Sequence, residues 1–531
     1  MAESNQTNGS SRINGEPGKS NNEYQKKSSL VITVELIDKL KNAGISLPQY
    51  IHDRPAEKLD IYGWSRGKSM CNSDYDDLIN AKLKIQRLNF LGRGSWTTCR
   101  CPKKSSKIGE LIDDIEETEI TGLEQIQVKS TFQISACALL DLVARSPRLK
   151  VLRFFGQVIL IDHNESFRPK RFLSDLEKVY WPYCTRKYKP VLTTLIKRNE
   201  NIHTFYSNGE VTFDLLRADA LPSLKYLSLS LNDDWNCKQG NPKKAYDYLS
   251  NTNFLSQAKN LEALEIRTFD LKLDEDMDQS TSQKIERLFE NFKVTFWDQL
   301  TKLTSLKYLA IYGSWELEKI CRELAKHAIQ AELLKINLMP TSVLSAIDSG
   351  DDSPELSMAE AVRNLKKLPQ LRSLHYLCHE KLGNIDNKTV IAFKELIDLI
   401  WNLDLKVCFT PEVEELITNI IRRGNQVGKT YKILLHVEAK NQDNANCLIE
   451  SVLKFNSATS LRIKLSSLAE SATTERFGKP AYSNFQVWGL EQIANTRDSN
   501  MFQRLQADWN KYDSIFDEGE YSVDSISDLS V

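Results

Sequence analysis

A short apolar phrase recurs along most of this chain and constrains the fold more than any other feature of the sequence. The phrase is an apolar residue, two others, a second apolar residue, one other and a third apolar residue. Clear copies are Leu123-Ile126-Val128, Leu149-Leu152-Phe154, Leu224-Leu227-Leu229, Leu261-Leu264-Ile266 and Leu306-Leu309-Ile311. Such recurrence indicates a repeat architecture, in which each unit is one small structural element stacked on the next.

The spacing of the copies supports a repeat. Successive copies begin 26, 27, 26 and 22 residues apart, at Leu123, Leu149, Leu176, Ile202 and Leu224. Longer intervals hold polar insertions, at 232–244 and 274–283. An ordinary α/β domain with a parallel sheet is the alternative, but its strands more often carry continuous apolar runs.

Helical patterns lie between the copies. Apolar residues recur at helical spacing in 134–145, 285–303, 316–331, 358–368, 390–403, 411–423 and 443–455. Short strands that alternate with helices predict an α/β fold of about twelve or thirteen strand–helix units. Because one unit cannot bury its apolar face alone, we expect neighbouring units to share a continuous core.

Several pieces of the chain resemble leucine-rich repeats of the long, helix-containing intracellular type. They are SPRLKVLRFFG (146–156), LPSLKYLSLSLND (221–233), AKNLEALEIRTFD (258–270), LTSLKYLAIYGS (303–314) and LPQLRSLHYL (368–377). This type occurs in F-box substrate receptors and ribonuclease-inhibitor-like proteins. The resemblance implies an irregular solenoid with a curved parallel sheet and helices on its convex side. The chain departs from the family in its irregular repeat length and in mostly lacking the Asn or Cys that follows the third leucine.

The resemblance and the composition divide the chain into five parts. Residues 1–29 are rich in Asn, Ser and Gly and are predicted to be a disordered tail. Residues 30–82 are predicted to be an N-terminal cap over the first repeat, with a divergent F-box-like segment as the alternative. The solenoid is expected over 83–470, a C-terminal cap over 471–511 and an acidic disordered tail over 512–531.

Composition excludes several classes of protein. The 70 basic and 71 acidic residues nearly balance, which argues against a general nucleic-acid binder. No uncharged apolar run reaches the length of a membrane-spanning helix. The ten cysteines are scattered, several of them within apolar segments, as expected for reduced thiols. We therefore expect an intracellular protein of the cytoplasm or nucleus.

No motif predicts an enzyme, a cofactor or a metal site. Gly424 and Gly428 are separated by three residues, whereas a phosphate-binding loop needs four and must open a helix. Cys99 and Cys101 lack the second cysteine pair of a structural zinc site. The seven histidines accompany no nucleophile motif.

Two surface segments suggest other roles. Residues 348–353, with Ser349 and Ser353, resemble an element that ubiquitin ligases recognise when both serines are phosphorylated; an exposed insertion is the alternative. The basic run 168–171 precedes several aromatic residues near Trp181. This run favours the alternative of a nuclear scaffold with a local nucleic-acid-binding patch.

The strand phrase also predicts a binding surface. Side chains alternate in direction along a strand, so residues between the apolar positions face the concave surface. The predicted protein-binding residues are Arg153, Phe155, Lys178, Tyr180, Tyr206, Tyr226, Arg267, Tyr308 and Tyr312. Aromatic and arginine side chains are enriched at binding hot spots, although packing between strands without a partner would also explain them.

These observations together predict a non-enzymatic scaffold that recognises a protein partner on its concave face. The family resemblance adds a more specific expectation, namely the substrate-receptor subunit of a ubiquitin-ligase-type complex with a ubiquitin-ligase adaptor as a partner. An enzyme with dispersed catalytic residues is a further alternative.

Overall fold

The computed structural model describes the greater part of the repeat region and short parts of its flanks. The described residues are 29–80 except 55 and 66, 85–97, 120–159, 174–230 except 183 and 185–187, 255, 258–268, 279–313, 317–338, 358–378 except 369, 387–408 except 397–398, 410–419 except 417, 432–438, 461–465, and 507, 508, 510–512, 514 and 515. The segments 168–171, 348–353, 424–430 and 443–455, which carry predictions made above, lie outside them.

One long parallel sheet organises the described residues. Its 15 strands follow one another in chain order, and each pairs in parallel with the next. They are β1 (Ser29–Thr33), β2 (Lys58–Tyr62), β5 (Arg87–Leu91), β7 (Gln125–Val128), β9 (Val151–Phe154), β11 (Lys178–Trp181), β12 (Thr204–Asn208), β13 (Tyr226–Ser230), β14 (Ala263–Thr268), β15 (Tyr308–Gly313), β16 (Leu333–Leu338), β17 (Ser373–Cys378), β18 (Ile400–Cys408), β19 (Lys432–Glu438) and β20 (Leu461–Leu465). The predicted α/β class with a long parallel sheet is therefore confirmed.

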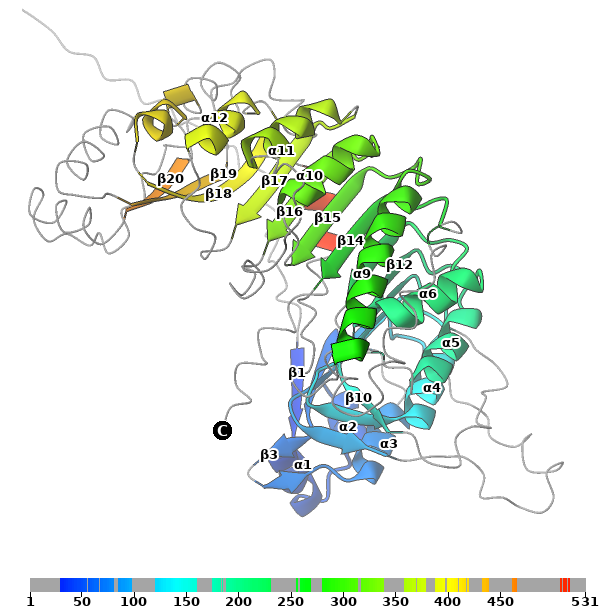
Figure 1. Ribbon diagram of the computed structural model, residues 1–531. Coiled ribbons are helices and arrows are strands. Elements are labelled where there is room, and N and C mark those ends of the chain that lie inside the picture. Colours follow the sequence, from blue (N-terminus) through cyan, green and yellow to red (C-terminus); the bar gives the residue numbers. More distant parts are fainter. Residues whose placement is uncertain are drawn as a thin grey trace, which may run out of the picture.

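Helices line one face of this sheet, and the sheet bends away from them (Figure 1). They are α1 (Val34–Asn42), α2 (Leu47–His52), α3 (Asn72–Asn80), α4 (Ala136–Ala144), α5 (Lys189–Lys197), α6 (Gly209–Arg217), α9 (Gln279–Leu300), α10 (Leu317–Lys326), α11 (Met358–Asn364) with the 3-10 turn η4 (Leu365–Lys367), and α12 (Asn387–Glu395). Side-chain caps begin several of them; the Asn208 side chain, for example, accepts from the backbone N–H of Val211 at the start of α6.

Two smaller sheets lie beside the main one. The first joins β6 (Gly94–Trp96), β8 (Phe132–Ser135) and β10 (Gln157–Ile159) in parallel, and the second is the antiparallel pair β3 (Trp64–Ser65) and β4 (Lys68–Ser69).

The recurring apolar residues form the core between sheet and helices. In β15, Leu309 and Ile311 are fully buried in the main cluster, which also contains the apolar residues of the neighbouring strands and of the helices. The intervening residues Tyr308, Ala310 and Tyr312 belong to a separate cluster. This alternation places the two sets on opposite faces of the sheet, so the predicted division of the strand residues is confirmed.

The main sheet begins earlier than the sequence predicted. Strands β1 and β2 pair with each other, and β2 pairs with β5, so the ladder starts at Ser29 and not at residue 83. Leu59 and Ile61 are fully buried like their counterparts in later strands. The prediction missed β2 because Ala56, at the first position of its phrase, is too small to stand out. The region 29–80 thus contains strands as well as helices, whereas the F-box-like alternative predicted apolar helices.

One predicted helix was too long. The apolar spacing of 390–403 predicted a single helix, but α12 ends at Glu395 and β18 begins at Ile400. The helical and strand periodicities are hard to separate in this stretch, because the apolar residues at the end of the helix are followed directly by those of the strand.

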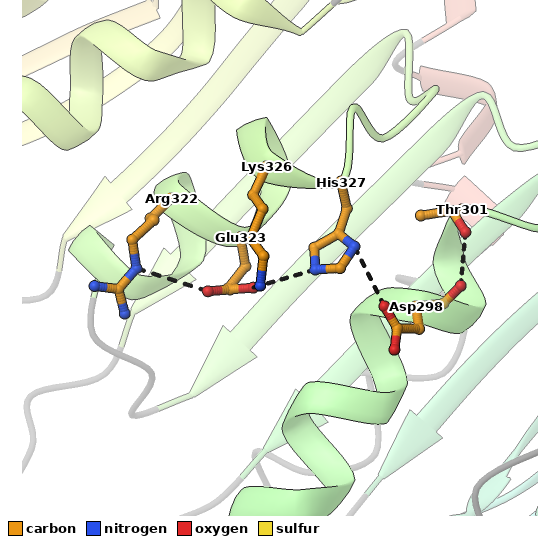
Figure 2. A network of polar contacts seen from close by, with 6 residues as sticks. All are labelled: Asp298, Thr301, Arg322, Glu323, Lys326 and His327. Carbon is orange, nitrogen blue, oxygen red and sulfur yellow. Dashed lines mark hydrogen bonds and ion pairs between the residues drawn. The ribbon is translucent and has the colours of Figure 1, made fainter.

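A network of polar contacts joins two neighbouring helices on the outer side (Figure 2). His327, just past the end of α10, lies 3.5 Å from a carboxylate oxygen of Asp298 in α9 and 3.3 Å from one of Glu323 in α10. Both ring nitrogens therefore face carboxylates. We interpret this network as a connection between the two helices.

The turn after α10 contains the strained residue Ala328. The backbone N–H of Ile329 donates to the carbonyl of Leu324, and that of Ala328 donates to Ala325, which is the Schellman pattern of a helix C-terminus. Ala328 has a φ of 46°, in the left-handed region that disfavours a Cβ atom. Gly44 occupies the same position after α1 with a φ of 68°.

Replacing Ala328 with glycine is therefore expected to stabilise the protein. Relief of the left-handed strain, partly offset by the greater entropy of unfolded glycine, should raise the free energy of unfolding by about 0.5–1 kcal/mol. Urea unfolding followed by tryptophan fluorescence measures the change. Gly44→Ala is the matched control and should lower the free energy of unfolding. Nothing lies within 4 Å of the added Cβ, so its effect comes from the left-handed backbone alone. A loss of stability in Ala328→Gly would contradict the prediction.

Candidate functional site

All nine predicted binding residues lie on or at the end of the strands that form the helix-free face of the sheet. Tyr180 pairs in register with Tyr206 on one side and with Arg153 on the other, so the predicted proximity of the two tyrosines is confirmed. Farther along, Arg267 pairs with Tyr312. We call this surface the aromatic face and define it by the nine predicted residues, Arg153, Phe155, Lys178, Tyr180, Tyr206, Tyr226, Arg267, Tyr308 and Tyr312.

The aromatic residues of this face are less accessible than the sequence predicted. Phe155, Tyr180 and Tyr206 form one buried cluster. Tyr308 and Tyr312 are buried in a second cluster, and Tyr226 is half-buried against it. The correction has a physical reason: large side chains on adjacent parallel strands lie about 4.8 Å apart and cover one another, and a distant part of the chain also covers the second cluster.

Cationic side chains lie over several of these rings. The Arg153 guanidinium is 5.5 Å from the centre of the Tyr180 ring. Arg267 lies between two strands, 5.7 Å from the Tyr206 ring and 4.9 Å from the Tyr312 ring. Lys335 is 5.5 Å from the Tyr312 ring on the other side. These distances are within the range of cation–π attraction, so the face alternates aromatic and positive groups.

A buried carboxylate holds the centre of the aromatic face. Glu265 is 1% exposed, and its Oε1 accepts from the Ser228 hydroxyl at 2.7 Å and from the Arg267 guanidinium at 2.8 Å. Within the described structure its Oε2 has no hydrogen-bond partner. The carboxylate fixes the position of the Arg267 side chain between the two tyrosine rings.

A ladder of ionisable side chains, most of them charged, runs along the start of the strands, and sequence reasoning missed it. Each member follows the first apolar residue of a phrase, and backbone hydrogen bonds of 2.8–3.0 Å join consecutive members. We define the charge ladder as Glu124, Lys150, Glu177, His203, Lys225, Glu262, Lys307, Glu332 and Arg372. The charge of consecutive members mostly alternates between negative and positive. An alignment of the repeats by their apolar residues would have revealed this pattern in the sequence.

Several neighbours in the charge ladder form ion pairs. Lys150 lies 2.5 Å from Glu177, Lys307 lies 3.8 Å from Glu262, and Arg372 lies 2.7 Å from Glu332. Exposed pairs of this kind contribute little to stability individually. Their arrangement instead gives one edge of the aromatic face a defined pattern of positive and negative groups.

The C-terminal segment, defined as the described residues 507, 508, 510–512, 514 and 515, is helical and packs on the aromatic face. It is drawn in red beside β14 and β15 in Figure 1. The ring of Tyr512 stacks on that of Tyr308, with centroids 5.0 Å apart and planes at 29°, and meets the edge of Tyr226 at 6.3 Å. Tyr512 is only 4% exposed, so this ring is the main anchor of the segment.

Three further residues of the C-terminal segment contact the sheet. Asp508 lies 3.8 Å from Arg372, and Lys511 lies 3.9 Å from Glu262, so both meet opposite charges of the charge ladder. The backbone carbonyl of Ile515 accepts a 3.2 Å hydrogen bond from the Tyr180 hydroxyl.

This packing corrects the predicted start of a disordered acidic tail at residue 512. Tyr512 and Ile515 are helical and packed on the sheet. The acidic composition suggested solvation, but Tyr512 and Ile515 lie at helical spacing within that composition and give the segment an apolar side.

Burial also affects two ionisable groups at this site. It raises the pKa of the Tyr512 phenol, and the nearby Glu262 carboxylate adds to the effect. Burial lowers the pKa of His203, partly opposed by Glu177. Both groups are therefore held in their neutral forms, which suits packing against the neighbouring Tyr226 ring.

Two further features of the described residues concern metal ligands and membrane-spanning helices. In the part of the chain that the structure describes, no three His, Cys, Asp or Glu side chains converge as metal ligands would. Among the described helices, none has the length and apolar character needed to cross a membrane. Comparison with known proteins finds no family model that matches this chain and no curated protein with significant similarity to it.

Removing the buried carboxylate is expected to destabilise the aromatic face. Glu265→Ala deprives Ser228 and Arg267 of their acceptor and should lower the free energy of unfolding by about 2–3 kcal/mol. Thermal or urea unfolding measures this loss. The double change Glu265→Met with Arg267→Met should cost less than the sum of the single changes, since it leaves no unpaired charge. Ser230→Ala, on the same face, is the control and should change stability little; a neutral Glu265→Ala would contradict this account.

Proposed function

We propose that this protein recognises another protein through the aromatic face. The observation that carries the proposal is the packing of a helical segment on that face, anchored by the buried ring of Tyr512 between Tyr308 and Tyr226. A surface that accommodates one helix through aromatic stacking and charge pairing has the features of a helix-binding surface. Tyrosine and arginine are also the residue types that most often dominate binding energy.

The proposal includes the architecture. We infer that the sequential parallel strands with helices on one face constitute a leucine-rich-repeat-type solenoid. Support comes from the recurring phrase, the strand order and the separation of apolar and aromatic residues onto opposite faces. Such solenoids use their concave face for binding because it presents many side chains on a rigid surface.

The most specific part of the proposal concerns the complex in which this protein acts. The resemblance to F-box receptors favours a role as the substrate-binding subunit of a ubiquitin-ligase-type complex, in which the aromatic face holds the substrate. An adaptor would bind elsewhere on the chain. This division predicts that changes on the aromatic face affect substrate capture and leave adaptor capture unchanged.

Changing Tyr226 and Lys178 together tests the proposed binding surface. Both side chains are half-buried, so Tyr226→Ala with Lys178→Glu should leave the fold intact while removing a hot-spot ring and reversing a charge. Capture of specific partner proteins should fall by about tenfold or more, equivalent to about 1.4 kcal/mol. Affinity purification of the full chain with quantitative mass spectrometry measures the loss.

The control is Tyr62→Ala, because Tyr62 is an exposed tyrosine near the opposite end of the sheet, on β2. It should leave capture unchanged, and circular dichroism should show equal thermal midpoints for all variants. Undiminished capture by a folded Tyr226 and Lys178 double variant would refute the proposed surface. Recovery of a ubiquitin-ligase adaptor with every variant would support the specific pathway, and its absence would count against it.

A further inference from the structure

The residues by which the C-terminal segment contacts the sheet share one side of its helix. Asp508, Lys511, Tyr512 and Ile515 stand at positions i, i+3, i+4 and i+7, which lie in line on a helix surface. Recognition of helices in grooves uses this spacing of anchors. The described residues that lie off this line, Ala507, Asn510 and Ser514, are exposed.

Each anchor meets a complementary group. The acidic Asp508 faces Arg372, and the basic Lys511 faces Glu262, which are two members of the charge ladder. The ring of Tyr512 enters the aromatic cluster, and Lys511 lies 4.9 Å from that ring and 5.7 Å from Tyr226. The Ile515 side chain is partly buried against the same cluster. Two charge matches, one stacked ring and one aliphatic contact therefore define a sequence pattern.

We propose that the aromatic face binds helical protein segments that present an acidic residue, a lysine, a tyrosine and an aliphatic residue at positions i, i+3, i+4 and i+7. We further propose that the C-terminal segment is the built-in version of this ligand, which a partner must displace. The inference rests on the proposed function and specifies the chemistry of the partner.

The contacts are suited to displacement. The two ion pairs are long, at 3.8 and 3.9 Å, and three of their four side chains are exposed, so they confer orientation more than affinity. Only Tyr512 is deeply buried. A weak ligand suffices within one chain, because a tether gives it an effective concentration on the order of millimolar. A partner segment with the same anchors and additional contacts therefore competes successfully.

A peptide-binding experiment on the full chain tests this proposal. The probe is a fluorescein-labelled peptide with the sequence of residues 505–518, and fluorescence anisotropy gives its dissociation constant. Tyr512→Ala removes the main anchor of the built-in ligand, so this variant should bind the probe about tenfold or more tightly than the wild-type chain. Tyr512→Phe keeps the stacked ring and should bind like wild type. A probe with alanine in place of its tyrosine should not bind.

A charge reversal tests the pattern without touching the core. In the Tyr512→Ala background, Arg372→Glu should weaken binding of the normal probe and restore it for a probe with lysine in place of Asp508. Glu332, the other partner of Arg372, stays unchanged in both proteins. Tyr62→Ala in the same background is the matched control and should bind the normal probe unchanged.

Three results would overturn the inference. One is equal probe binding by wild type and a folded Tyr512→Ala chain. Another is failure of the charge reversal to restore binding. The third is a wild-type dimer, detected by sedimentation, that dissociates on Tyr512→Ala, because the segment would then occupy the face of a second copy. These outcomes are separate from the capture experiment: specific partners lost in the Tyr226 and Lys178 variant would still support protein recognition with a different ligand.

Discussion

Hydrogen bonding between consecutive parallel strands is the constraint on which the rest of this structure depends. Because the strands of the main sheet pair with one another in chain order, the side chains of one strand have counterparts in register on the next, apart from a shift between β17 and β18. Apolar residues therefore align into a continuous core, and the residues between them align into rows on the opposite face. Burial of the aligned leucines against the helices fixes this register, since a shift by one residue would expose them.

The same alignment explains why charge and aromaticity are organised on the helix-free face. Residues on separate strands become neighbours in register, so Tyr180, Tyr206 and Arg153 form one group although they are far apart in sequence. The charge ladder arises in the same way from residues that precede each strand. In the proposed function, these ordered charges and rings would distinguish the direction and register of a bound helix.

Much of the fold was predictable because the local pattern repeats. The phrase predicted the strands, their parallel order and the division of faces. It missed β2, where Ala56 weakens the phrase, and it could not separate α12 from β18 within a continuous apolar stretch. The nine residues of the aromatic face were found from alternation alone. Their burial was not, because exposure depends on what else in the chain covers a surface.

Short-range periodicity was enough to predict the alternation of strands and helices, the pairing of Tyr180 with Tyr206, and the residues that face away from the helices. The position of the C-terminal segment on the aromatic face, in contrast, is a long-range contact that no local pattern predicts. Tyr512 and Tyr308 are about 200 residues apart, and no periodic pattern links them. Their contact is accompanied by ion pairs of Asp508 and Lys511 with Arg372 and Glu262, two residues that only the pairing of the strands brings onto the same sheet.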